Sequence, residues 1–362
     1  MTPHPPPQQQ SARSQPDFLD SMYRLFTWRI TSHVPHWDWE QIRSEVQSWE
    51  QWLPTWCRWA ERHVALGDHA LAHGRRLTAG EAYVRAGVFY HWATFMSVED
   101  SDAFRAALEA GARAWAKGAP LVDPPYELID VPFEGTALPG YLRKPTGVER
   151  PPLVVLLPGG DSTKEELYDQ AEHLVRRGLA AFAFDGPGHG LVSFRLKLRP
   201  DEEVAVSTVL DHLLGRDDLD PERVAVLGIS YGGLFAIRAA AVDARVRAAV
   251  SMSSWYTPAH RYATQPPLSR SALRQYLGDD PAAVQDAITV AGYAERVRVP
   301  VLQIYGGQDP ASPPDQAERT AAELGGPNEL VVIEEGVHVA NNVPYRSRSM
   351  AADWLAERLR AA

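Results

Sequence analysis

Short apolar runs recur along the later part of the chain, separated by segments long enough to hold a helix. Six of these runs are predicted strands: residues 153–157, 180–184, 224–227, 246–251, 301–305 and 330–333. Runs of this kind are typical of a mostly parallel sheet joined by right-handed crossovers. Two earlier runs, 126–133 and 137–143, flank Glu134-Gly135 and predict an antiparallel pair. The pattern therefore predicts an α/β fold with eight strands.

The first part of the chain has the periodicity of helices instead. The expected units are a Pro/Gln/Ser-rich disordered tail at 1–16, a helical, cap-like domain at 17–120 and an α/β domain at 121–362. Tryptophans gather in the helical part, and four of them share one helix face by their spacing: Trp49, Trp52, Trp56 and Trp59. These rings are open to three interpretations, namely packing inside the protein, lining a pocket for a flat substrate, or forming a dimer interface.

Charge and composition narrow the classes of partner. The 362 residues carry a formal net charge of −10, which argues against nucleic acid and anionic membranes as partners. No apolar run approaches the roughly 18 to 20 residues of a membrane-spanning helix. The first ten residues lack the basic and apolar regions of a secretory signal. The single cysteine, Cys57, excludes an internal disulfide. Together these features predict a cytoplasmic protein.

The run 224–227 continues into Gly228-Ile-Ser230-Tyr231-Gly232, and helix-forming residues follow at once. A strand, a tight glycine-flanked turn and a helix are the context of a nucleophile elbow. Because glycine lacks a Cβ atom, the chain can turn sharply and raise the hydroxyl of Ser230 above the sheet edge. The amide of Tyr231, at the start of the helix, is predicted to face an oxyanion formed by attack of that hydroxyl.

Two further residues complete a predicted Ser-His-Asp triad. Asp309 follows the fifth of the six apolar runs and His338 follows the sixth, so each lies just beyond the carboxyl end of a strand. Catalytic groups of open α/β sheets gather at that end, and the chain order Ser, Asp, His is that of an α/β-hydrolase. The imidazole accepts the proton of serine, and the carboxylate orients the imidazole. Asp315 is a rival carboxylate, and His189 is a rival base that is interpreted as a turn or substrate-side residue.

A second oxyanion donor is expected where the strand at 153–157 ends in Pro-Gly159-Gly160. Gly160 or Asp161 is the predicted donor, because hydrolases of this fold supply an amide from the loop after the third strand. The segment 253–295 is longer than a plain crossover and is expected to add lid-like material. The sequence contains no metal-ligand cluster, phosphate loop or dinucleotide fingerprint, so neither a cofactor nor a metal is expected.

Three motifs together resemble one branch of the α/β-hydrolases. They are Gly159-Gly160-Asp161-Ser-Thr-Lys-Glu-Glu166, Asp185-Gly-Pro-Gly-His189-Gly190 and the elbow around Ser230. Over about residues 75–360 the chain is similar to the branch of 2,6-dihydroxypseudooxynicotine hydrolase, which also includes a fungal heptaketide hydrolase and the fermentation-respiration-switch esterases. Its helical N-terminal domain is also similar in kind to the helical domain of this branch. The resemblance implies hydrolysis of a carbon–carbon bond next to a ketone in aryl or polyketide 1,3-dicarbonyl substrates, or hydrolysis of esters.

The resemblance also implies roles for single residues. Ser230, Asp309 and His338 match the triad, and Asp161 matches an extra carboxylate that contacts substrate, where the nicotine-pathway enzyme has a glutamate after leucine. An N-cap on the helix expected near Lys164 is the other interpretation of Asp161. The expected partner is a small-molecule acyl or ketone substrate. Two alternatives remain for the function: a carboxylesterase, thioesterase or acyltransferase with the same triad, and a binding protein that keeps the fold. The sequence leaves open whether the protein is a monomer or a homodimer.

Overall fold

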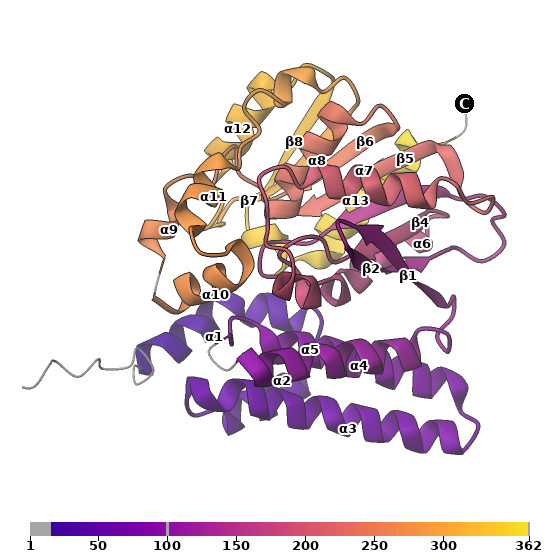
Figure 1. Ribbon diagram of the computed structural model, residues 1–362, viewed down its shortest axis with the longest axis vertical. Coiled ribbons are helices and arrows are strands. Elements are labelled where there is room, and N and C mark those ends of the chain that lie inside the picture. The colour runs from indigo at the N-terminus through magenta and orange to yellow at the C-terminus, as the bar shows by residue number, and fades with distance from the viewer. Residues whose placement is uncertain (1–15, 99–100, 266, 361–362) are drawn as a thin grey trace, which may run out of the picture.

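The computed structural model describes residues 16–98, 101–265 and 267–360. A layer of helices from the first part of the chain lies against an eight-stranded sheet that has helices on both faces (Figure 1). The disorder expected at residues 1–16 falls, apart from Pro16, outside the described residues. The helices of this layer are α1 (Pro16–Thr31), α2 (His36–Glu45), α3 (Trp52–Ala72), α4 (Arg76–Thr94) and α5 (Ser101–Gly118).

The sheet has the strand order β1-β2-β4-β3-β5-β6-β7-β8. β2 pairs antiparallel with β1 and with β4, and the pairs from β4 onward are parallel. The strands are β1 (Tyr126–Phe133), β2 (Thr136–Arg143), β3 (Pro152–Leu157), β4 (Ala180–Phe184), β5 (Asp220–Ile229), β6 (Val246–Met252), β7 (Val301–Gly306) and β8 (Asn328–Ile333). All six apolar runs lie in strands, and the predicted α/β-hydrolase fold is confirmed.

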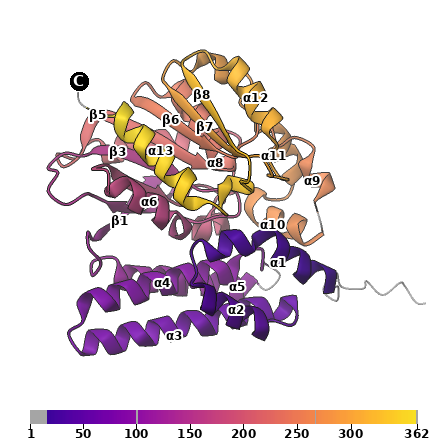
Figure 2. The same cartoon turned by 180° about the vertical axis from the view of Figure 1, so that it is seen from behind.

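The neighbouring strands β3 and β4 are apolar and buried throughout, because helices cover both faces of the sheet. Along β3, Leu153, Val155 and Leu157 belong to one apolar cluster, and Val154 and Leu156 belong to the other, as the two-residue period of a strand requires. α7 and α8 contribute to the first cluster (Figure 1), and α6 and α13 contribute to the second (Figure 2). These helices are α6 (Tyr168–Val175), α7 (Glu203–Leu213), α8 (Tyr231–Val242) and α13 (Pro344–Arg358).

Indole rings form the centre of the helical layer. Trp39, Trp52, Trp56 and Trp92 are fully buried. Trp49 stacks on Trp52 with ring centroids 5.1 Å apart, and Trp39 stacks on Trp56 at 6.1 Å. The predicted tryptophan face spans two elements, because Trp49 lies in a 3₁₀ turn that precedes α3. Of the three interpretations of these rings, the structure shows packing within the helical layer.

The segment between β6 and β7 carries α9 (Arg261–Thr264), α10 (Pro267–Leu277) and α11 (Pro281–Ala287). α10 lies beside the helical layer in both views (Figure 1, Figure 2). Ala272 and Tyr276 of α10 share an apolar cluster with Phe104 and Leu108 of α5. The expected lid-like segment therefore touches the helical layer directly.

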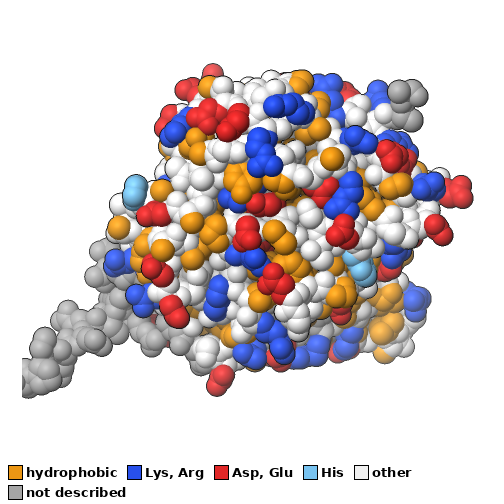
Figure 3. Space-filling model, turned by 45° about the horizontal axis from the view of Figure 1, so that its top comes forward, with side chains coloured by type: hydrophobic (Ala, Val, Ile, Leu, Met, Phe, Trp, Pro, Cys, Tyr) orange, Lys and Arg blue, Asp and Glu red, His pale blue; other side chains and the backbone are white. Residues whose placement is uncertain are grey.

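The surface mixes charges of both signs. Figure 3 shows acidic and basic side chains interspersed over the face in view, so this face offers no broad area of positive charge to a polyanion. Among the residues that the structure describes, no helix combines the length and the apolar character that a membrane crossing requires.

Candidate active site

Ser230 lies at the turn between β5 and α8 with the backbone of a nucleophile elbow. Its φ is 56° and its ψ is −119°, a conformation that residues other than glycine rarely adopt. Close approach of the backbone explains the flanking glycines. A Cβ atom on Gly228 would lie 1.9 Å from the carbonyl oxygen of Gly232, and one on Gly232 would lie 2.2 Å from that of Leu157. The turn therefore needs glycine at both positions.

The side chains of Asp309, His338 and Ser230 form one hydrogen-bonded chain. His338 Nδ1 lies 2.8 Å from Asp309 Oδ2, and His338 Nε2 lies 3.1 Å from Ser230 Oγ. The three residues follow β7, β8 and β5, whose carboxyl ends meet at one edge of the sheet. This geometry allows the imidazole to accept the hydroxyl proton of Ser230.

The surroundings of Asp309 favour its ionised form. Its Oδ1 accepts hydrogen bonds from the amides of Ala311, at 2.8 Å, and Ser312, at 3.0 Å. Burial by itself raises the pKa of Asp309, but the charge and hydrogen bond of His338 and these two amides outweigh burial and lower the pKa below its usual value. An ionised carboxylate at Nδ1 keeps a proton on that nitrogen and leaves Nε2 as the acceptor.

Neither Asp315 nor His189 takes part in this row of hydrogen bonds. Asp315 is exposed in the first turn of α12 (Pro314–Glu323). His189 is buried, and its Nε2 lies 3.1 Å from the carbonyl oxygen of Gly159. Burial lowers the pKa of His189, which favours the neutral ring. His189 therefore anchors the loop after β3 rather than facing substrate.

Gly160 and Tyr231 lie together beside Ser230. A Cβ atom on Gly160 would lie 2.9 Å from the Tyr231 ring. Tyr231 is the first residue of α8, so its amide has no acceptor within the helix. Both residues line the cavity that Ser230 and His338 also line. The arrangement can present two amides to an oxyanion, and the donor role of each stays a prediction.

Asp161 is a carboxylate on the wall of the same cavity, with 28% of its side chain exposed. Its Oδ1 accepts a hydrogen bond from Nη1 of Arg29 at 3.1 Å. The N-cap interpretation is wrong, because the amide of Lys164, which begins the 3₁₀ helix Lys164–Leu167, donates to Oδ1 of Asp185 at 2.8 Å. Asp161 is left facing the cavity with one oxygen held by an arginine.

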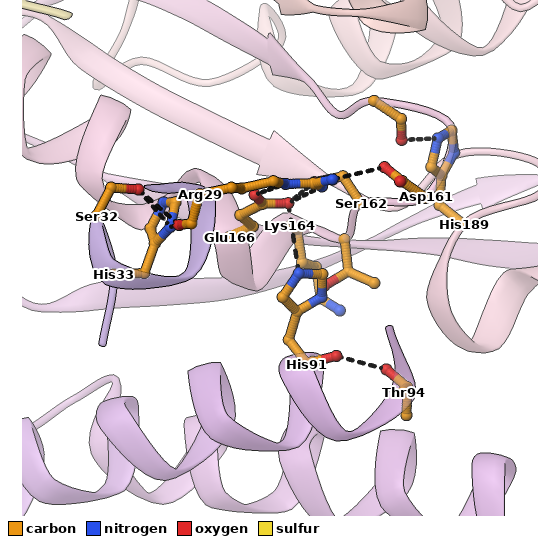
Figure 4. A network of polar contacts seen from close by, with 12 residues as sticks. Arg29, Ser32, His33, His91, Thr94, Asp161, Ser162, Lys164, Glu166 and His189 are labelled. Atoms are coloured by element: carbon orange, nitrogen blue, oxygen red, sulfur yellow. Dashed lines mark hydrogen bonds and ion pairs between the residues drawn. The ribbon is translucent and has the colours of Figure 1, made fainter. Parts of the chain in front are cut away.

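Arg29 joins the helical layer to the loop after β3 (Figure 4). Its Nε and Nη2 donate to the two carboxylate oxygens of Glu166 at 2.6 and 2.7 Å. Burial by itself lowers the pKa of Arg29, but Asp161 and Glu166 outweigh burial and raise it. The pKa of Glu166 is well below its usual value, because Arg29 outweighs the opposite effect of burial. Sequence analysis missed Arg29 since its partners lie 132 and 137 residues away and no local motif marks it.

A second residue of the helical layer holds the same loop. Nε2 of His91, on α4, lies 3.4 Å from Oε2 of Glu166, and Nδ1 of His91 lies 3.0 Å from Oγ1 of Thr163. Figure 4 shows His91 reaching the loop from its helix. The hydroxyl of Ser162 donates to Glu166 as well. The loop that carries Gly160 is therefore anchored through Glu166 to two helices that precede the sheet in sequence.

A cavity of about 160 Å³ opens above Ser230 where the helical layer meets the sheet edge and the β6–β7 segment. Its wall takes side chains from all three parts, among them Phe26, Arg29, Met96, Asp161, Trp255 and Arg261. A concave, largely apolar site with a few polar groups is typical of small-molecule binding. Within residues 16–98, 101–265 and 267–360, no group of three or more His, Cys, Asp or Glu side chains is placed to hold a metal ion.

The family comparison covers the sheet and the part of the helical layer that begins with α3. The family model of FrsA-like esterases matches residues 50–360. The chain belongs to the FrsA-like esterase family. The resemblance carried by the three sequence motifs is thereby confirmed, and this FrsA-like protein is an enzyme of the α/β-hydrolase class.

Individual relatives extend the comparison. The 2,6-dihydropseudooxynicotine hydrolase of Paenarthrobacter nicotinovorans is 28% identical over 84% of this chain and 83% of its own length. Hydrolase LUC6 of Fusarium sp is 40% identical over 56% of this chain and 51% of its own length, so the match spans about half of that fungal relative. The crystal structure of 2,6-dihydroxy-pseudo-oxynicotine hydrolase superposes with a TM-score of 0.82 at 27% identity, covering 92% of this chain and 95% of that one. The shared fold therefore includes the helical layer.

Proposed function

We propose that this FrsA-like hydrolase cleaves a carbon–carbon bond next to a ketone in an aryl or polyketide-like 1,3-dicarbonyl substrate. One observation carries the proposal. The cavity that contains Ser230 and His338 also contains Asp161, a carboxylate whose Oδ1 is held by Arg29. A simple ester needs a triad and oxyanion amides but no further carboxylate. The similarity to 2,6-dihydropseudooxynicotine hydrolase over 84% of the chain supports a ketone substrate.

The reaction begins when Oγ of Ser230 attacks the ketone carbon and Nε2 of His338 takes the hydroxyl proton. The amides of Gly160 and Tyr231 stabilise the resulting oxyanion. Collapse of this intermediate breaks the bond to the next carbon, and the electron pair of that bond is delocalised into the second carbonyl as an enolate. The imidazolium of His338 returns its proton to the enolate carbon, which gives a ketone and acyl-Ser230. Water, deprotonated by His338, then releases a carboxylic acid.

Asp161 acts in this scheme on the substrate rather than on Ser230. Its carboxylate accepts a hydrogen bond from a hydroxyl group of the substrate, and the ion pair with Arg29 keeps it oriented toward the cavity. An aryl or enol hydroxyl beside the scissile bond is the group expected to reach it. Loss of the carboxylate is therefore expected to affect 1,3-dicarbonyl substrates more than simple esters.

A carboxylesterase, thioesterase or acyltransferase is the second candidate, favoured by the esterase family that matches residues 50–360. The same Ser230, His338 and Asp309 would serve it. An alkoxide or thiolate leaves without a neighbouring carbonyl, so this candidate gives Asp161 no role in the chemistry.

The two candidates differ in the substrates that the purified protein should hydrolyse. The test compares aryl 1,3-diketones with esters and thioesters of the same acyl groups. The proposal expects carboxylic acid and ketone in equal amounts, with a loss of roughly 10³-fold or more in Ser230→Ala. Asp161→Asn is expected to slow diketone hydrolysis more than ester hydrolysis. Turnover of esters alone would favour the second candidate. Full activity of Ser230→Ala would exclude both.

A further inference from the structure

The guanidinium of Arg261 lies on the wall of the cavity that Ser230 and His338 line. It stacks over Trp255 at 5.2 Å from the ring centroid. The same indole lies 6.0 Å from the imidazole of His338, measured between ring centroids. Arg261 and the proposed general base, His338, therefore both lie next to the Trp255 ring. A guanidinium that lies over a ring keeps its N–H groups for other partners.

Arg261 differs from Arg29 in that its guanidinium has no ion-pair partner among the described residues. Asp161 supplies the carboxylate of the cavity wall, and this carboxylate is bound to Arg29. Arg29 in turn is shared between Asp161 and Glu166. Within the described ranges of the chain, no carboxylate lies at ion-pair distance from Arg261, and burial lowers its pKa despite the opposing effects of Tyr231 and Asp309. The half-buried guanidinium of Arg261 therefore has no carboxylate bound to it, and the carboxylate of Asp309 attracts it only from beyond ion-pair distance.

We propose that Arg261 binds a carboxylate group of the substrate, so that the cavity selects acyl compounds with an acid group on the acyl arm. A cation that is partly removed from water and has no anion beside it is stabilised by an anionic ligand. A guanidinium binds a carboxylate through two parallel N–H···O bonds, which also fixes its orientation. The inference rests on the proposed function in that the acid-bearing compound is the substrate of Ser230. It applies to an ester as well as to a 1,3-dicarbonyl compound.

A matched pair of 4-nitrophenyl esters tests the proposal. The glutarate half-ester carries a carboxylate, and its methyl ester does not. We expect the wild-type protein to favour the acid by about ten- to hundred-fold in kcat/KM, the size of a charge-assisted hydrogen-bonded pair. Arg261→Met should abolish this preference by raising the KM of the acid far more than that of the methyl ester, and Arg261→Lys should keep part of the preference. Rising salt should weaken the preference of the wild type.

Arg274→Met is the matched control, because Arg274 is exposed on the same β6–β7 segment and lies outside the cavity wall. This variant should keep the wild-type preference. An unchanged acid-to-ester ratio in Arg261→Met would overturn the proposal, and so would a wild-type preference for the methyl ester.

A binding measurement separates this proposal from the proposed function, because it needs no turnover. In isothermal titration calorimetry, glutarate should bind the wild type at least about ten-fold more tightly than Arg261→Met. Tight binding without cleavage of any 1,3-diketone would leave Arg261 as the acid-binding residue and reject carbon–carbon cleavage. Diketone cleavage with equal glutarate affinity in both proteins would reject the role of Arg261 alone.

Discussion

The guanidinium of Arg29 and the carboxylate of Glu166 form a two-point ion pair inside the protein, with N–O distances of 2.6 and 2.7 Å. Their side chains are 10% and 3% exposed. A buried pair of this kind contributes little net stability compared with an apolar pair, yet removal of one partner leaves the other charge unpaired and costs about 3–5 kcal/mol. The position of the loop with Gly160 and Asp161 therefore depends on α1, a helix of the other layer.

Arg29→Met should lower the free energy of unfolding by about 3 kcal/mol or more and should also lower kcat, because Glu166 loses its partner and Asp161 loses its anchor. Arg29→Lys should recover part of both, since an ammonium keeps the charge but not the two-point geometry. Urea unfolding and steady-state rates measure the two effects. Arg43→Met is the control: its guanidinium lies 3.8 Å from Glu40 at the surface, and a change within about 0.5 kcal/mol is expected. Equal losses in the two Met variants would contradict the assigned role of Arg29.

Asp309→Asn should lower kcat by roughly 10³- to 10⁴-fold while the protein stays folded, because an amide next to Nδ1 of His338 no longer enforces the required tautomer. The comparison variant is Asp315→Asn, an identical change at an exposed position of α12. It should keep the wild-type rate. Initial rates on an activated ester, with circular dichroism as the check of folding, decide the point. A large loss in Asp315→Asn with normal activity in Asp309→Asn would reverse the assignment.

His33 couples folding to pH on the acid side. Its ring is buried, and burial, followed by the charge of Arg348, lowers its pKa from 6.5 to about 3. The folded protein thus keeps His33 neutral at pH values where the unfolded chain protonates it. The unfolded state then binds more protons, so stability is fully present above pH 6.5 and falls as the pH drops from 6.5 toward 3. The slope from this group alone is about 1.4 kcal/mol per pH unit.

His33→Gln should therefore flatten the plot of unfolding free energy against pH between 6.5 and 4, whatever its effect on stability at neutral pH. Urea titrations at half-unit steps of pH provide the plot. The same substitution at His36, which is exposed at the start of α2, should leave the wild-type slope. An acid slope in His33→Gln equal to that of the wild type would show that this ring does not carry the coupling.

The fold could be predicted from sequence because its signals are local. The length and composition of each apolar run predict a strand. The sequence Gly228-Ile-Ser230-Tyr-Gly232 likewise predicts the turn at Ser230 from neighbouring residues alone. Asp309 and His338 were found because each directly follows such a run, and parallel strands bring their carboxyl ends to one edge of the sheet.

Contacts between segments that lie far apart in the chain could not be predicted from the sequence. Arg29 and His91 lie in helices whose local pattern does not distinguish a surface cation from one that anchors a loop of another layer. The N-cap interpretation of Asp161 failed for the same reason, since the cap comes from Asp185, 21 residues beyond the amide that it binds. The unpaired state of Arg261 likewise follows from charges that only the folded chain brings together.

Gly232 sets how closely the elbow approaches the loop after β3. A Cβ atom there would lie 2.2 Å from the carbonyl oxygen of Leu157, and neither backbone can give way cheaply. Gly232→Ala should therefore displace the hydroxyl of Ser230, slow its labelling by a fluorophosphonate at least about ten-fold and destabilise the fold by about 1–3 kcal/mol. Gly215→Ala is the control, because a Cβ atom there would lie 3.9 Å from the carbonyl oxygen of His212, and it should be neutral or slightly stabilising. Labelling of Gly232→Ala at the wild-type rate would mean that the reactivity of Ser230 does not depend on this approach.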